Sequence, residues 1–303
     1  MKRKIIKLGT ATLVVSLPSK WTKKFNLKQG DEIDVEEENS NLLLQTKKCI
    51  AAKKEITIDL TDQDEKGMEI ILTHVYRRGF ERIVVKNINE NILKTIRKVV
   101  KNLLLGFEIS KRTSDSCIIE NLAEPTEQKG DVLLRRIFLM VKEMQNKILS
   151  DFEKKNYNDS DIEEIRNQTD RFTIYYRRIL SKQAEKETTF RWELLTTLMR
   201  IDHSYHYMYK FASENKLKPD PDVISLLKEL KNYFQILYDA YFNKDMNKIK
   251  QINKLRKEFQ YGKCLKMLES KKGKNIVLHS FIREIFRTIQ LGQSSVISLI
   301  ISY

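Results

Sequence analysis

Residues 1–45 alternate short apolar runs with turn-forming residues, and this alternation most constrains what the chain can fold into. Runs rich in β-branched residues and bounded by turn residues are typical of strands. Four strands are predicted, in the runs Arg3–Gly9 and Leu13–Pro18 and over Ile33–Glu37 and Leu42–Gln45. Pro18 suits the first turn of a short helix between them, where its missing N–H costs nothing. A segment this short buries too little surface to be stable alone, so we expect it to need a partner.

Three stretches of this segment carry a family resemblance. They are the basic run Arg3–Gly9, the tripeptide Ser16-Leu17-Pro18, and the stretch LKQGDEIDV at Leu27–Val35. In this order they resemble the AbrB/SpoVT/MazE-type DNA-binding domain. The resemblance implies a swapped-hairpin β-barrel, in which two chains interleave their hairpins and basic residues of both contact DNA. We therefore expect residues 1–48 to form a DNA-binding domain that also makes the chain a homodimer.

Basic residues on the first strand and the short helix are the predicted DNA contacts. The resemblance implies this role for Arg3, Lys4 and Lys23. Neighbouring cations would add to the positive electrostatic potential that attracts DNA. The predicted set is Arg3, Lys4, Lys7, Lys20, Lys23 and Lys24. Such cations neutralise phosphates, which gives affinity with little sequence reading. The chain has no arginine after Leu8-Gly9, where the family has one. The alternative is that the segment serves only to join two chains into a dimer and does not bind DNA.

Composition narrows the class of the whole chain. With 303 residues there is room for two or three domains. Nine Gly and four Pro are few for this length and favour long helices over an all-β fold. The net charge of +15 suits an anionic partner such as nucleic acid. Three Cys, far apart and odd in number, indicate neither a disulfide framework nor a zinc site.

A small α+β domain is predicted over residues 54–122. Strands and helices alternate there, with strands at Glu55–Leu60, Arg82–Lys86, Phe107–Thr113 and Ser116–Asn121, and helices at Asp64–Arg78 and Asn89–Leu105. Asp62 or Asp64 can cap the first helix, and Asn87 is the expected cap of the second. Cations recur at helical spacing in the second helix, at Lys94, Arg97, Lys98 and Lys101. A solvated helix face explains them more simply than an anion site does.

An all-helical domain is predicted over residues 126–303. Apolar residues recur at 4-3-4 spacing, as in Ile137, Val141, Met144 and Ile148, in Leu230, Phe234, Leu237 and Tyr241, and in Leu278, Ile282, Ile285 and Ile289. Such stripes bury against neighbouring helices of a bundle. Breaks at 156–160, near 185, at 217–221, near 243 and around 271–273 predict six helices. The prolines of Lys218–Pro221 divide them into three and three, which indicates an internal repeat.

Two of these predicted helices carry a second resemblance. The stretches are LMRIDHSYHYMYKF at Leu198–Phe211 and NQTDRFTIYYRRIL at Asn167–Leu180. They resemble the PhoU family, phosphate-signalling proteins built from two three-helix bundles. An AbrB-like domain followed by an α+β segment and a PhoU-like region is the arrangement of archaeal phosphate-uptake regulators. The resemblance therefore implies a role in phosphate uptake and a phosphate-transport or signalling protein as a possible partner.

The PhoU relatives bind metal through paired acids one helical turn apart, and this chain departs from that pattern. Arg166 stands at the first acid position of the second helix, and Arg256 and Gln260 stand at the pair of the fifth. An arginine at a ligand position repels a cation. The remaining weak candidates are Asp170, Asp202, His203 and His206, and two His with one Asp lack a clear fourth ligand. We expect no metal ion and no other cofactor.

The leading interpretation is a non-enzymatic, cytoplasmic regulator. The sequence contains no nucleophile elbow, P-loop or HExxH motif. No apolar stretch is long enough to span a bilayer, and Met1-Lys2-Arg3 leads into a strand. The predicted function is DNA-binding transcription regulation, with sensing or docking through the helical region. The alternative is a PhoU-like signalling protein that regulates a transport system without binding DNA.

Overall fold

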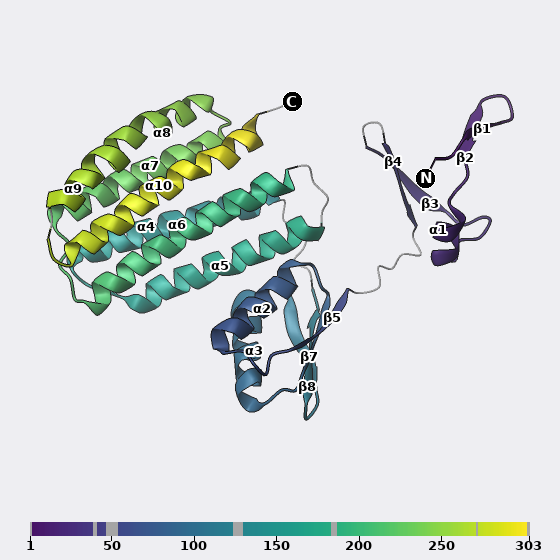
Figure 1. Cartoon of the computed structure of the whole chain (residues 1–303), viewed down its shortest axis with the longest axis horizontal. Coiled ribbons are helices and arrows are strands. Elements are labelled where there is room, and N and C mark those ends of the chain that lie inside the picture. Colours follow the sequence, from purple (N-terminus) through teal and green to yellow (C-terminus); the bar gives the residue numbers. More distant parts are fainter. Residues whose placement is uncertain are drawn as a thin grey trace. The chain divides into compact units, whose positions relative to one another are not determined.

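The computed structural model describes residues 2–38, 41–46, 54–123, 130–182, 187–270 and 272–301. The chain divides into two compact units, residues 1–54 and residues 55–303, each considered by itself (Figure 1). Strands form the first unit almost alone, and helices dominate the second after residue 130. This confirms the predicted multidomain α+β class with N-terminal strands and a largely helical C-terminal region.

The N-terminal unit contains two separate antiparallel hairpins joined by a short helix. Its elements are β1 (Ile5–Leu8), β2 (Thr12–Val15), α1 (Ser19–Lys24), β3 (Ile33–Glu38) and β4 (Asn41–Thr46). Strand β1 pairs with β2, and β3 pairs with β4. Gly9 has φ +69° in the first turn, and Gly30 has φ +90° before β3, conformations that favour glycine. The predicted barrel requires a second copy and stays a prediction.

The α+β part of the second unit is a four-stranded sheet with two helices. Its elements are β5 (Glu55–Asp59), α2 (Glu65–Arg77), β6 (Arg82–Lys86), α3 (Glu90–Leu103), β7 (Phe107–Arg112) and β8 (Ser116–Asn121). The sheet order is β5-β6-β8-β7, in which only the β5–β6 pair is parallel. Along β6, Ile83 and Val85 are buried while Arg82, Val84 and Lys86 are not. This alternation buries one face of the sheet, as expected for strands of period two.

Helix caps in this part follow the predicted chemistry with one correction. Asp64 caps α2 by accepting a hydrogen bond from the Gly67 N–H at 2.7 Å. Helix α3 is capped by Asn89, which accepts from the Ile92 N–H at 2.9 Å, so the predicted cap at Asn87 is wrong. Asn87 instead has φ +54° and donates its side-chain amide to Asp59 at 2.6 Å. A left-handed turn residue cannot supply the extended backbone of an N-cap.

The helical part begins at residue 130, and long helices run through it side by side (Figure 1). Its elements are α4 (Gly130–Lys154), α5 (Asp159–Lys182), α6 (Thr188–Glu214), α7 (Pro221–Phe242), α8 (Met246–Glu258), the π-helical turn η1 (Phe259–Lys263), α9 (Cys264–Ser270) and α10 (Asn275–Ile300). The run from α8 to α9 is continuous and corresponds to the predicted fifth helix. All the predicted stripe residues except Tyr241, which is partly buried, are fully buried. No described helix is long and apolar enough to cross a membrane.

Helix α5 packs against α2 and α3 of the α+β part, so residues 55–303 form one compact unit. The contact includes Arg178 of α5, which is 2% exposed. Its guanidinium donates to the carbonyl oxygens of Tyr76 and Phe80 at 2.9 and 2.7 Å and to the Glu81 carboxylate at 2.8 Å. It also lies over the rings of Tyr76 and Phe107, 4.9 and 4.8 Å from their centroids. No sequence pattern pointed to this arginine.

Candidate nucleic-acid interface

The six predicted DNA-binding cations lie on two elements of the N-terminal unit. Arg3 and Lys4 precede β1, Lys7 lies within it, and the other three lie on α1. All six side chains are exposed: Arg3, Lys4, Lys7, Lys20, Lys23 and Lys24. Exposure is what phosphate contacts require, because a buried cation cannot reach a duplex.

Helix α1 presents three lysines beside two aromatic residues, and the Lys24 ammonium lies 5.4 Å from the centroid of the Phe25 ring. Lys20 is three and four residues before Lys23 and Lys24, a spacing that places neighbours on one helix face. Trp21 and Phe25 are also one turn apart, and their ring centroids are 5.7 Å apart in an edge-to-face contact. These rings are partly buried, which fixes the helix on the unit. The lysines are thereby presented together at the surface.

The register of the first hairpin gives Lys7 a different setting from the other cations. Ile5 lies opposite Val15, and Lys7 lies opposite Leu13. Residues that face each other across an antiparallel pair share one face of the sheet. Lys7 therefore shares a face with Ile5, Leu13 and Val15, all of which are exposed in the single chain. In a dimer that covers this face, Lys7 would lie beside the dimer contact.

Large apolar side chains are exposed on both hairpins of the single chain. The exposed fractions are 69% for Ile5, 67% for Leu13 and 63% for Leu42. Others that are exposed are Ile6, Leu8, Val15, Val35 and Leu43. So many exposed large apolar side chains in one small unit indicate an interaction surface. The partner expected from the sequence, a second copy of the same hairpins, would cover it.

The four candidate metal ligands lie on α5 and α6 but are engaged in separate contacts. His203 bonds Asp170 at 2.8 Å, and His206 bonds Glu163 at 2.9 Å. Arg166 lies near both acids, 3.4 Å from Glu163 and 3.9 Å from Asp170. Among the described residues, no group of three or more His, Cys, Asp or Glu side chains is arranged to hold a metal ion.

The fourth candidate, Asp202, is fully buried beneath these contacts. It accepts a hydrogen bond from the Thr169 hydroxyl at 3.3 Å, and its other oxygen has no hydrogen-bond partner among the residues that the structure describes. Burial raises the pKa of Asp202 well above its usual value, and the neighbouring Asp170 raises it further. Both effects favour the neutral form of Asp202 in the α5–α6 contact.

Replacing Asp202 by asparagine should change how stability depends on pH. The native state holds the Asp202 proton more tightly than the unfolded state, so this group's contribution to stability is lost as pH rises above about 4. An amide does not titrate, so D202N should gain stability relative to the wild type as pH rises from about 4 to 8. Urea unfolding at several pH values measures this difference. The exposed Asp62→Asn is the control, and an equal pH trend in both variants would contradict the assignment.

Arg256 and Gln260, which stand at the metal-ligand positions of the fifth predicted helix, also make ordinary packing contacts. Gln260, in η1, is buried and donates to the Phe286 carbonyl at 3.3 Å. Arg256 donates to the Tyr261 hydroxyl at 3.2 Å, with its guanidinium 5.4 Å from the ring centroid. Gln260 thus joins η1 to α10, whereas the Arg256 contact stays within the run α8–η1.

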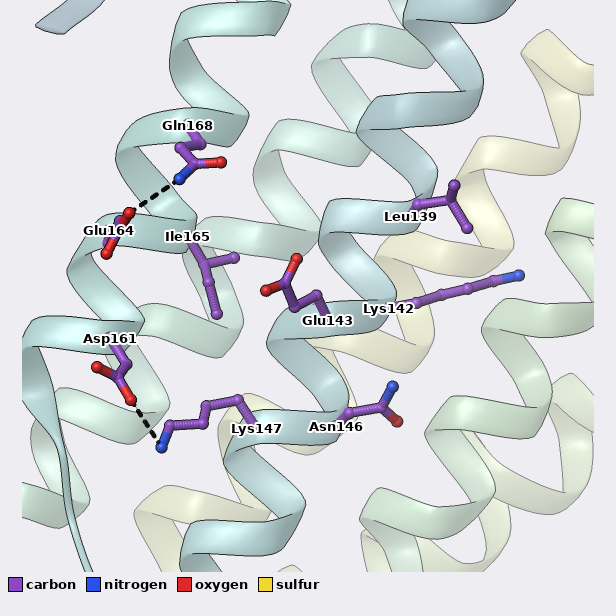
Figure 2. A pocket seen from close by; sticks show the side chains of 9 residues that line it. All are labelled: Leu139, Lys142, Glu143, Asn146, Lys147, Asp161, Glu164, Ile165 and Gln168. Carbon is purple, nitrogen blue, oxygen red and sulfur yellow. Dashed lines mark hydrogen bonds and ion pairs between the residues drawn. The ribbon is translucent and has the colours of Figure 1, made fainter.

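A cavity of about 700 Å³ lies between α4 and α5, and its lining carries charged residues of both signs (Figure 2). Lys147 pairs with Asp161 at 2.9 Å, and Gln168 donates to Glu164 at 3.1 Å. Lys142 extends away from these groups, and its ammonium lies 3.4 Å from the centroid of the Tyr238 ring. The lining thus combines one ion pair with acidic and basic groups that face different ways, and it does not gather charge of one sign for a ligand.

The comparisons with known proteins bear on the N-terminal unit. The family model of antidote-toxin recognition MazE, a bacterial antitoxin, matches residues 6–48. Comparisons with curated proteins and with solved structures found no match. The matched span begins in β1 and takes in α1, so it includes four of the six predicted cations; Arg3 and Lys4 precede it. The predicted MazE/AbrB-type domain is confirmed, while the PhoU-like resemblance stays a prediction.

Proposed function

We propose that this chain is a DNA-binding transcriptional regulator that acts as a homodimer and catalyses no reaction. The observation that carries the proposal is the MazE-type match at residues 6–48, over a unit that exposes basic residues on β1 and α1. The exposed apolar hairpin residues support a dimer, because a second copy would cover them. In such a dimer every DNA-contacting cation occurs twice.

The process that we propose for regulation is phosphate uptake or metabolism, with the helical part sensing a signal or docking on a partner protein. This step rests on the resemblance of Asn167–Leu180 and Leu198–Phe211 to the PhoU family. The engagement of His203 and His206 by Asp170 and Glu163 supports a helical part that works without a bound metal.

A second candidate function is a signalling protein whose hairpins only join two copies. The register of Lys7 favours it, because this cation shares a face with apolar residues of the expected dimer contact. The missing arginine after Leu8-Gly9 also favours it. The two functions differ in whether the chain binds DNA.

Salt titration of DNA binding separates the two functions. If Arg3, Lys4 and Lys23 of both copies each meet a phosphate, log K should fall against log salt with a slope of about −5. Replacing Lys23 by alanine removes two contacts per dimer and should flatten this slope by about two. The loss should be similar on all duplex sequences, since phosphate contacts carry no base information. Fluorescence anisotropy at several salt concentrations measures it.

The matched control is Lys250→Ala, which removes an exposed lysine of α8 in the helical part. This variant should bind with the wild-type slope. Binding that is undetectable at low salt would favour the signalling function. Equal changes in both variants would show that DNA is held by the net charge and not by the N-terminal unit.

A further inference from the structure

A second cavity, of about 600 Å³, lies where α3, β7 and α5 meet. Arg97, Lys101 and Leu104 line it from α3 and its end, Phe107 and Glu108 from β7, and Arg171 from α5. Gly106, at φ +82°, turns the chain from α3 into β7 at its edge. The volume is within the range of small-molecule sites, about 300–1,000 Å³.

The cations of this cavity are unpaired, in contrast to their neighbours. Lys98 on the same helix pairs with Glu65 at 2.6 Å, whereas Arg97, Lys101 and Arg171 form no ion pair with any residue that the structure describes. The Nε of Arg171 is buried and has no hydrogen-bond partner within the described ranges. A buried donor without a partner costs free energy. Arg171 lines the cavity and adds its positive charge to that of Arg97 and Lys101.

The cavity lining carries three positive charges and only one negative charge. Arg97 and Lys101 are four residues apart on α3, which places them one turn apart on one helix face. Arg171 adds a third cation from the facing helix, and Glu108 is the single carboxylate of the lining. Mutual repulsion of the three cations is relieved when an anion binds among them.

The rest of the lining decides what kind of anion fits. Val100, Leu104 and Phe107 form an apolar part and are at most 6% exposed. Apolar walls with a few convergent polar groups are typical of sites for small organic molecules. The guanidinium group of arginine can donate two parallel hydrogen bonds to the oxygens of a phosphate group. The negative charge of a phosphate monoester also offsets the charge of three cations better than a single carboxylate does.

We propose that this cavity binds a small phosphate monoester, with its phosphate held by Arg97, Lys101 and Arg171 and a compact organic body against Leu104 and Phe107. Such a site goes beyond DNA binding, because it gives the second unit a ligand of its own. All residues that line this site lie in the second unit.

Calorimetric titration of the full chain with adenosine monophosphate, ribose 5-phosphate, inorganic phosphate and succinate tests the proposal. We expect the two monoesters to bind more tightly than inorganic phosphate or succinate. Arg171→Gln should weaken monoester binding by about tenfold or more, the usual effect of losing a charge-assisted hydrogen bond. Arg97→Gln should weaken it in the same direction. The melting temperature should rise with ligand in the wild type and rise less in these variants.

Lys94→Gln is the matched control, because it removes the same charge from the same helix outside this cavity. Circular dichroism of each variant shows whether the fold is kept. The proposal is overturned if no phosphate monoester binds to folded protein, or if Lys94→Gln weakens binding as much as Arg171→Gln. Binding of a short duplex at this site without binding of the monoesters would also overturn it.

Discussion

Replacing Arg178 by alanine should destabilise residues 55–303 by about 3–5 kcal/mol, the range observed when one partner of a buried charge pair is removed. The Arg178 side chain is 2% exposed and holds two backbone carbonyls and the Glu81 carboxylate together. Without it, the carbonyls of Tyr76 and Phe80 lose a donor and a cavity opens between α2 and α5. Lys182 still pairs with Glu81, which limits the loss. Urea unfolding followed by circular dichroism measures the change.

Two further variants define the cause of this loss. Arg200→Ala removes an exposed arginine of α6 and should change the free energy of unfolding by about 0.5 kcal/mol or less. Arg178→Lys keeps the charge but loses the planar guanidinium with its several donors. Its free energy of unfolding should therefore lie between those of the wild type and R178A. A loss below about 1 kcal/mol in R178A would show that α5 is held on the α+β part by apolar packing alone.

Replacing Leu13 by arginine should convert the proposed dimer to a monomer. Leu13 is 67% exposed in the single chain and shares its face of the hairpin with Ile5 and Val15. In a dimer that covers this face, a charge at Leu13 would be buried without a partner, at a cost of several kcal/mol. Light scattering should give a mass near 35.9 kDa for the variant and about twice that for the wild type.

Leu139→Arg is the matched control for the dimer. Leu139 lies on α4 and is 49% exposed, so the same substitution is made at an exposed leucine outside the hairpins. This variant should remain a dimer. A chain that begins at Lys54 should be monomeric. If it stays dimeric, or if Leu139→Arg is the variant that dissociates, the second unit makes the dimer.

Local sequence patterns were sufficient to place most helices and strands. The 4-3-4 stripe of Ile137, Val141, Met144 and Ile148 predicted a buried helix face, and all four side chains are fully buried in α4. Strands Arg82–Lys86 and Ser116–Asn121 were predicted at the residues where they lie. Periodicity succeeds here because each helix or strand must turn one face toward a core, whatever its neighbours are. The cap of α3 was missed because Asn87 and Asn89 are chemically identical, and only the backbone distinguishes them.

What the sequence determined by itself is the order of parts, the helix and strand positions and the type of the N-terminal domain. Tertiary structure alone decided which charged side chains find partners on other helices and strands. Lys98 and Arg97 are neighbours on α3, yet one pairs with Glu65 and the other lines a cavity. Arg178 and Arg171 lie on the same helix, but one is fully bonded and the other has a buried Nε without a partner. These charges acquire their roles from groups far away in sequence, which local spacing does not encode.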